Sequence, residues 1–281
     1  MKPLTAKRQN SGRSVLIQFV AVLLGLLIMF PIIFCICSAF KSENQILNGS
    51  GQLFPREITW DNFRMVFEQT PIIRYIFNSL FIAVVTSAVR ILISSMAAYA
   101  FSFMEFPLKE FWFMLLLGTM MIPADVTLVS NYFVVAKMKL VGTYTGVMIV
   151  YFVNALNVFM FRQYFKTVSS EIRDAASVDG CGDLRFFASI LMPISKPVIA
   201  TAFISSFVSM WNIYTWPLLV TKTNEMRTVQ VAITMLTSSD SSTAYGAVMA
   251  GTLVILLPAA IVFLTFRKWI IEGATAGSVK G

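Results

Sequence analysis

The stretch SVLIQFVAVLLGLLIMFPIIFCICSAF, residues 14–40, decides the solvent in which this chain folds. It contains no charged side chain, and Gln18 is its only large polar one. A bilayer core about 30 Å thick is crossed by roughly 20 apolar helical residues, so this run is long enough to span a membrane. A secretory signal peptide is the alternative, but the run is too long for one and lacks a small-residue cleavage site. We therefore expect a transmembrane helix.

Similar runs recur along the rest of the chain. They cover residues 75–104, 111–136, 140–161, 197–221 and 241–266. Only Arg90 interrupts the first of these five runs and only Asp125 the second. The pattern predicts an all-α membrane protein with six transmembrane helices.

The composition excludes most other classes of protein. Apolar residues make up 57% and charged residues 13%, whereas soluble domains have about 45–50% and about 25%. The sequence has no histidine, and two of its three cysteines, Cys35 and Cys37, lie inside the first apolar run. We therefore expect no catalytic residues, no metal site and no disulfide framework.

The distribution of lysine and arginine predicts the orientation. These residues are more frequent in the loops on the side of the N-terminus, which places both termini in the cytoplasm by the positive-inside rule. The net charge of +8 comes from residues that flank the spans, so it indicates a lipid surface and not nucleic acid. The chain then divides into a cytoplasmic segment 1–13, a six-span domain 14–271 that includes a cytoplasmic loop 162–196, and a cytoplasmic tail 272–281.

The cytoplasmic loop contains the most informative polar sequence. Ser169 or Ser170 can cap a helix whose first turn includes Glu171 and Asp174, and acidic residues are favourable there. Ala175 and Ala176 follow, and we expect them to give this helix one small face that another surface can approach.

Gly180 predicts a sharp turn after this first helix. A second amphipathic segment, 184–191, is expected to end at Pro193. The loop thus reads as two short helices beneath the membrane. From these residues alone, an inert connector is as good an interpretation as a docking element.

The same residues resemble a known pattern. Permease subunits of bacterial ATP-binding-cassette importers share a loop with EAA, three residues, Gly, nine residues and I-x-L-P. This sequence matches it at Asp174-Ala175-Ala176, at Gly180, and at Ile190-Leu191-Met192-Pro193. Asp174 replaces the usual Glu and Met192 the usual Leu, so charge and apolarity are kept.

Further segments resemble the carbohydrate-importer branch of these permeases. Asn78-Ser79, residues 97–101, Phe106-Pro107 and residues 121–123 resemble the second permease of maltose-type and glycerol-3-phosphate-type systems. Residues 161–165 and 211–219 resemble the glycerol-3-phosphate relative, whereas residues 275–281 resemble the maltose relative. The solute class, a sugar or polyol derivative, therefore stays open between these two.

The resemblance implies an assembly in the bacterial cytoplasmic membrane. This chain would pair with a homologous second permease, two ATPase subunits and an extracytoplasmic solute-binding protein. It has no G-x-x-x-x-G-K-[ST] loop, so ATP and Mg²⁺ would be bound by the partner ATPases, and the chain itself would not be an enzyme. A secondary transporter or channel without an ATPase is the alternative, and it would show inverted repeats.

The resemblance also implies contact residues. The residues expected to couple the chain to the ATPase are Glu171, Asp174, Ala175, Ala176, Asp179, Gly180, Ile190 and Pro193. The tail residues Thr275, Ala276, Gly277, Ser278, Val279 and Lys280 would contact the ATPases, or else form a frayed terminus. The loop residues Ser238, Ser239, Asp240 and Ser241 would enter the binding protein's solute site, or else form a plain surface loop.

Two groups in the spans are candidates for the solute path. Trp211, Asn212 and Tyr214 could stack on a sugar ring and bind its hydroxyls, although an interfacial aromatic belt is the alternative. Arg90 and Asp125 lie at equal depth if both spans are straight, which allows an ion pair. Alternatively, Arg90 faces an anionic solute, or each charge contacts the partner permease or a cavity water.

Overall fold

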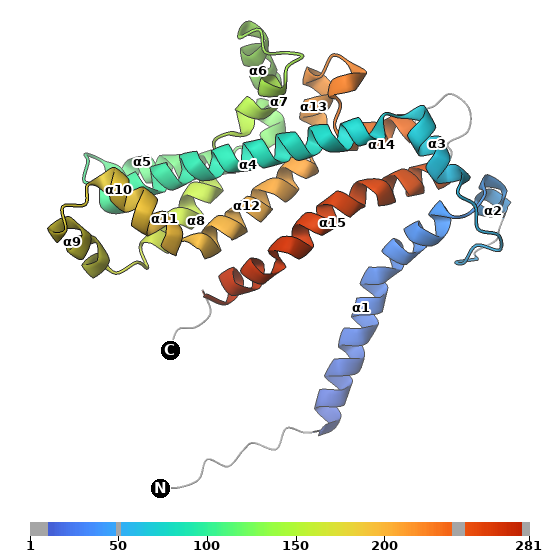
Figure 1. The fold of residues 1–281 in the computed structure, drawn as a ribbon, viewed down its shortest axis with the longest axis horizontal. Helices are drawn as coiled ribbons and strands as arrows, with labels where there is room; N and C mark the ends of the chain where they lie inside the picture. Colours follow the sequence, from blue (N-terminus) through green and yellow to red (C-terminus); the bar gives the residue numbers. More distant parts are fainter. Residues whose placement is uncertain (1–10, 49–51, 238–244, 277–281) are drawn as a thin grey trace. The chain divides into compact units, whose positions relative to one another are not determined.

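The computed structural model describes residues 11–48, 52–237 and 245–276, and these residues form helices and connecting segments without a strand (Figure 1). The chain divides into two compact units. One combines Met1–Thr70 with Leu236–Val254, and the other combines Pro71–Met235 with Ile255–Gly281.

The first unit contains α1 (Ser11–Ala39), α2 (Glu43–Asn48), α3 (Asp61–Gln69) and the start of α15 (Tyr245–Ala276). The buried amide of Asn62 joins α3 to the end of α1, because it donates to the carbonyls of Ala39 at 2.8 Å and Lys41 at 2.7 Å. Gly246 of α15 lies so close to this amide that a Cβ there would be 2.5 Å from Asn62 Nδ2. The amide thus fixes three segments of this unit.

The second unit is built around one long helix, α4 (Ile72–Phe103). Its other elements are α5 (Lys109–Gly118), η1 (Thr119–Met121), α6 (Ala124–Lys137), α7 (Tyr144–Met148), η2 (Ile149–Tyr151), α8 (Ala155–Phe165), α9 (Ser170–Val178), α10 (Asp183–Phe186), η3 (Phe187–Leu191), α11 (Met192–Ile194), α12 (Lys196–Trp211), α13 (Thr215–Val220), η4 (Asn224–Met226), most of α14 (Val229–Thr237) and the remainder of α15. Within this unit α4 packs along α12 and α8 (Figure 1).

Three described helical stretches are long and apolar enough to cross a membrane, namely Leu16–Ala39, Ile72–Phe103 and Tyr245–Thr265. Three further candidates are bent pairs of helices. They are Lys109–Met121 with Ala124–Lys137, Tyr144–Tyr151 with Ala155–Phe165, and Asp183–Ile194 with Lys196–Trp211. The chain therefore has up to six candidate spans if each bent pair counts as one.

The expectation of a straight span over 111–136 is wrong. The helix axis turns by 100° between η1 and α6, where Ile122 is extended and Pro123 precedes α6. Proline has no N–H to donate and disfavours helical geometry in the residue before it, so Ile122-Pro123 interrupts a run in which Asp125 is the only charged residue.

The expected span over 197–221 also ends early. Helix α12 stops at Trp211, and α13 begins only at Thr215. Pro217 cannot donate a hydrogen bond to the carbonyl of Ile213, so a continuous helix through this point would lose a bond and meet the proline ring. On the other side, the loop helix continues past Pro193 to Ile194 and turns by 79° into α12.

Candidate functional site

Helix α9 forms as its sequence predicts. The side chain of Ser169 accepts a hydrogen bond of 3.2 Å from the backbone N–H of Glu171, so Ser169 is the N-cap. Glu171 stands in the first turn, where a carboxylate interacts favourably with the helix dipole. Gly180 then adopts φ of +70°, a left-handed conformation that glycine reaches without steric cost. The predicted cap and the predicted turn are both confirmed.

The coupling residues expected from the sequence differ in exposure. The exposed ones are Glu171, Asp174, Ala175, Asp179, Gly180 and Pro193. Ile190 is half-buried and Ala176 is only 6% exposed. Ala176 packs into the hydrophobic core that also contains Phe165 and Phe186. The two alanines therefore do not share one open face, and only Ala175 remains available to another protein.

Two large apolar side chains beside the glycine turn are open to solvent. Val178 is 88% exposed at the end of α9, and Leu184 is 80% exposed in α10. The exposed residues next to them include Asp179 and Arg185, so the exposed part of the loop is both charged and apolar. An exposed surface of this kind is typical of a site that another protein covers.

The inner side of the loop is fixed to the long helix α4. The hydroxyl of Tyr99 donates to Asp183 Oδ1 at 2.7 Å. Arg173 Nη1 donates to the carbonyl of Phe103 at 2.6 Å, and its Nη2 lies 3.6 Å from the same Asp183 oxygen. The sequence patterns predicted none of these contacts of Tyr99, Arg173 and Asp183. The only signal in the sequence is an arginine and an aspartate on either side of the glycine turn.

A second charged contact lies at the carboxyl-terminal end of α8. Arg162 is 4% exposed, its Nη2 bonds Glu110 of α5, and its Cζ lies 3.9 Å from the centre of the Phe113 ring. Its Nε also donates to the carbonyl of Phe101 at 3.3 Å. A buried guanidinium with these partners ties α8 to α4 and α5, so Arg162 supports the helices that support the loop.

The proposed solute-path residues do not form one group. Trp211 is 4% exposed and stacks on Phe207 with ring centres 5.8 Å apart. Asn212 and Tyr214 are exposed, and Asn212 donates to the carbonyl of Val208 at 2.9 Å. The nearby Trp216 is 2% exposed and donates to the carbonyl of Gly146 at 3.2 Å. Only Asn212 and Tyr214 are open to a ligand.

The expected ion pair between Arg90 and Asp125 is absent from the described part of the chain. Arg90 is 4% exposed, and its Nε donates to the carbonyl of Tyr151, whose ring centre lies 5.6 Å from its Cζ. Asp125 is exposed in the first turn of α6. The turn at Pro123 invalidates the depth count that placed the two charges together. Arg90 instead binds a carbonyl at the break between η2 and α8.

The remaining expected contacts lie largely outside the described residues. This holds for Ser238 to Ser241 and for Gly277 to Lys280, whereas Thr275 and Ala276 form the end of α15. Among the residues that the structure covers, no group of three or more His, Cys, Asp or Glu is arranged to hold a metal ion.

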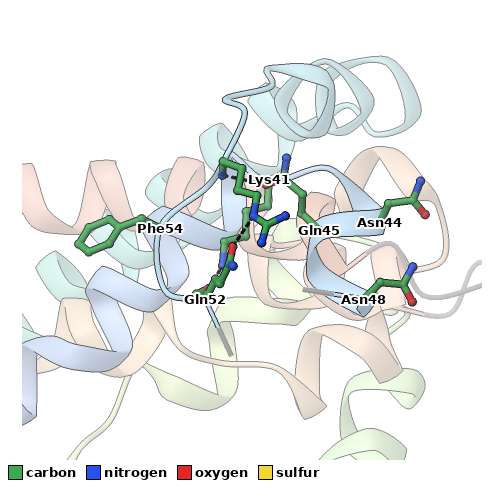
Figure 2. Close-up of a pocket in the computed structure, with 7 residues that line it drawn as sticks. Lys41, Asn44, Gln45, Asn48, Gln52 and Phe54 are labelled. Carbon is green, nitrogen blue, oxygen red and sulfur yellow. Dashed lines mark hydrogen bonds between the residues drawn. The ribbon is translucent and has the colours of Figure 1, made fainter. Parts of the chain in front are cut away.

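A small hollow of about 230 Å³ lies in the segment after α1 (Figure 2). Its lining consists of Lys41, Asn44, Gln45, Asn48, Gln52, Phe54 and Arg56. Lys41 Nζ donates to the carbonyl of Gln52, and Arg56 Nε donates to Gln52 Oε1 at 2.9 Å. The side chains of Lys41 and Arg56 thus bind Gln52 of the segment that lines the hollow. No pattern in the sequence predicted this hollow.

These features define a helical membrane protein with several apolar candidate spans and one exposed polar loop. A family model described as the binding-protein-dependent transport system inner membrane component matches residues 14–272. The chain therefore belongs to this family. It is a membrane-embedded permease subunit of an ATP-binding-cassette importer, a transport component and not a catalytic one.

Individual relatives agree with the family. The sn-glycerol-3-phosphate transport system permease protein UgpE of Yersinia pestis bv. Antiqua (strain Antiqua) is 30% identical over 269 residues, which cover 93% of this chain and 96% of that protein. The arabinooligosaccharides transport system permease protein AraQ of Halalkalibacterium halodurans is 33% identical over 269 residues, covering 94% and 93%.

A solved structure shares the fold. It is a bacterial ABC transporter involved in the import of the acidic polysaccharide alginate, with a TM-score of 0.84 and 20% identity. The match covers 96% of this chain and 100% of that chain. The expected permease fold is thereby confirmed in its all-helical character.

Proposed function

We propose that this chain forms one half of a heterodimeric pore with six spans and both termini in the cytoplasm. The three long helices and the three bent pairs correspond in order to the six apolar runs of the sequence, although their bounds differ. The excess of Lys and Arg on one side supports the orientation. Residues 1–13 and 272–281 are then cytoplasmic, and 14–271 form the permease domain.

The single observation that carries the proposal is the two-sided construction of the loop 169–194. Its outer side exposes carboxylates together with Val178 and Leu184, and its inner side is bonded to α4. A surface that is open outward and fixed inward suits a partner that pushes on it. We assign that partner as one of two ATPase subunits, which bind the ATP and Mg²⁺.

The proposed solute is a sugar or polyol derivative delivered by an extracytoplasmic binding protein. The relatives named above transport sn-glycerol-3-phosphate and arabinooligosaccharides according to their names, and both solutes are rich in hydroxyl groups. The exposed amide of Asn212 and the exposed ring of Tyr214 have the chemistry to bind hydroxyls and stack on a sugar ring. Trp211 would support them from behind.

Two further contacts belong to the same proposal. Residues 275–280 are assigned to the ATPases and residues 238–241 to the binding protein. Both assignments come from the resemblance of these segments to the maltose-type relative. Cross-linking of the first segment to the ATPases and of the second to the binding protein tests them.

The test is reconstitution of the chain with its companion subunits. We expect an ATPase to co-purify, and we expect uptake of labelled sn-glycerol-3-phosphate or labelled arabinooligosaccharide to require both ATP and the binding protein. Uptake driven by an ion gradient without any ATPase would instead support a secondary transporter. Coupled ATP hydrolysis without uptake of either solute would overturn the solute class.

A pair of variants tests the docking surface itself. Val178→Glu adds a charge at an apolar, exposed position of the loop and is expected to release the ATPase. Gln163→Glu adds the same charge at an exposed position of α8 and is expected to retain it. Equal retention by both variants would contradict the assignment of this surface.

A further inference from the structure

One carboxylate oxygen connects three helices at the inner end of the second unit. Asp183 Oδ1, in α10, accepts the Tyr99 hydroxyl of α4 at 2.7 Å and lies 3.6 Å from Arg173 Nη2 of α9. The loop helices on both sides of the glycine turn therefore meet at one atom that also binds α4, and Arg173 Nη1 makes a second bond to α4, to the carbonyl of Phe103 at 2.6 Å. The resemblance of the loop to its family concerned other residues and assigned no role to this oxygen.

The two contacts at this oxygen differ in strength. The side chains of Arg173 and Asp183 are 34% and 58% exposed, so water and salt screen their mutual attraction. Tyr99 is 5% exposed, and its hydroxyl donates to an ionised acceptor at a short distance. Hydrogen bonds to charged groups are roughly twice as strong as neutral ones. The Tyr99 hydroxyl is thus the firmer of the two contacts at this oxygen, and it is the one that links α10 to α4.

Aromatic packing holds the tyrosine in place for this bond. Its ring lies 5.3 Å from Phe103, 5.6 Å from Phe187 and 6.4 Å from Phe186. Phe103 belongs to the last turn of α4, whereas Phe186 belongs to α10 and Phe187 to η3. Because these contacts use only the ring, a phenylalanine at position 99 would keep them and lose the hydroxyl bond alone.

We propose that Tyr99, Arg173 and Asp183 are positioning residues that transmit movement of the cytoplasmic loop into α4. Tyr99 links α10 to α4, and Arg173 links α9 to α4 through the carbonyl of Phe103 while it orients the carboxylate that receives the Tyr99 hydroxyl. This inference rests on the proposed function, since it needs an ATPase that moves the loop. Removing the hydroxyl leaves the docking surface intact but weakens the connection between that surface and the pore helix.

The experiment compares two tyrosine variants in the complete importer complex in nanodiscs. Tyr99→Phe removes the bond to Asp183. Tyr144→Phe is the matched control. It removes a bond of 2.8 Å from the Tyr144 hydroxyl to Asn78, which lies on α4, as Tyr99 does, but away from the loop. Tyr99→Phe should lower binding-protein-stimulated ATP hydrolysis relative to the basal rate by about fivefold or more, the range of ordinary allosteric coupling. Tyr144→Phe should leave this ratio unchanged, and both should retain the ATPase.

Variants of the acceptor separate positioning from general stability. Asp183→Asn keeps an oxygen that can accept the Tyr99 hydroxyl and should preserve most of the stimulation, whereas Asp183→Ala should lower it at least as much as Tyr99→Phe does. The double variant Tyr99→Phe/Asp183→Ala should be no worse than Asp183→Ala alone, because both remove one interaction. Fully additive losses, or equal ratios in Tyr99→Phe and Tyr144→Phe, would overturn the inference. A wild-type chain that binds no ATPase would instead overturn the proposed function.

Discussion

Substitution of Gly180 separates a backbone cost from a docking cost. Gly180 has φ of +70°, and a Cβ added there would meet no atom within 4 Å. The left-handed conformation costs a residue with a Cβ roughly 1–2 kcal/mol. Gly180→Ala is therefore expected to lower the free energy of unfolding by about 1 kcal/mol through the backbone alone.

Gly182 provides the matched control two residues away. A Cβ there would also meet no atom within 4 Å, but its φ is −71°, which any residue adopts. Gly182→Ala should therefore leave stability unchanged or raise it by about 0.4–1 kcal/mol, because alanine restricts the unfolded chain. The difference between the two melting temperatures measures the cost of the turn.

A bulkier side chain at Gly180 tests docking. Gly180→Trp has the same backbone cost as Gly180→Ala, since neither side chain is β-branched, and its Cβ likewise meets no atom within 4 Å in the isolated chain. Against an ATPase on the loop surface, the indole would clash. We expect Gly180→Ala to retain the ATPase in pull-down experiments and Gly180→Trp to lose it. Wild-type transport by Gly180→Trp would refute the reasoning.

Two further substitutions test the packing of the second unit. Gly146→Ala would place a Cβ 2.1 Å from the carbonyl oxygen of Leu140. It should lower the melting temperature in detergent by an amount that reflects about 1–3 kcal/mol of overpacking, whereas Gly118→Ala, with open space around it, should not. Arg90→Leu leaves the buried carbonyl of Tyr151 without its partner and should cost about 1–3 kcal/mol by thermal unfolding. A selective loss of phosphorylated-solute uptake, with unchanged stability, would instead indicate an anion site at Arg90.

Local chemistry was predictable from the sequence wherever neighbouring residues decide the structure. The cap at Ser169 and the left-handed turn at Gly180 follow from side chains within a few residues of the helix ends. The apolar runs likewise follow from composition. None of these predictions requires knowledge of which distant segments touch.

The helix breaks could not be read from hydropathy, because the run around Pro123 is apolar on both sides of the break. Hydropathy measures transfer into lipid, whereas the bend depends on a missing backbone donor. The error then spread to Arg90 and Asp125, whose equal depth presumed straight helices. Arg90 instead binds the carbonyl of Tyr151, which is free because the chain breaks near it. The buried guanidinium of Arg90 in α4 and the carbonyl of Tyr151 at the break after η2 thus satisfy each other. No local pattern encodes such a pairing.

The composition of the first unit has a consequence for biosynthesis. Asn62 and Cys35 meet Gly246 and Met249, which the ribosome adds 184 and 214 residues later. Until residues 245–254 emerge, α1 and α3 lack these neighbours, while most of the second unit's residues already exist. A nascent chain stalled near residue 235 should therefore give a protease-resistant second unit and a sensitive amino-terminal part. Quality-control proteases would then cleave an unfinished chain in its amino-terminal part and not in the second unit.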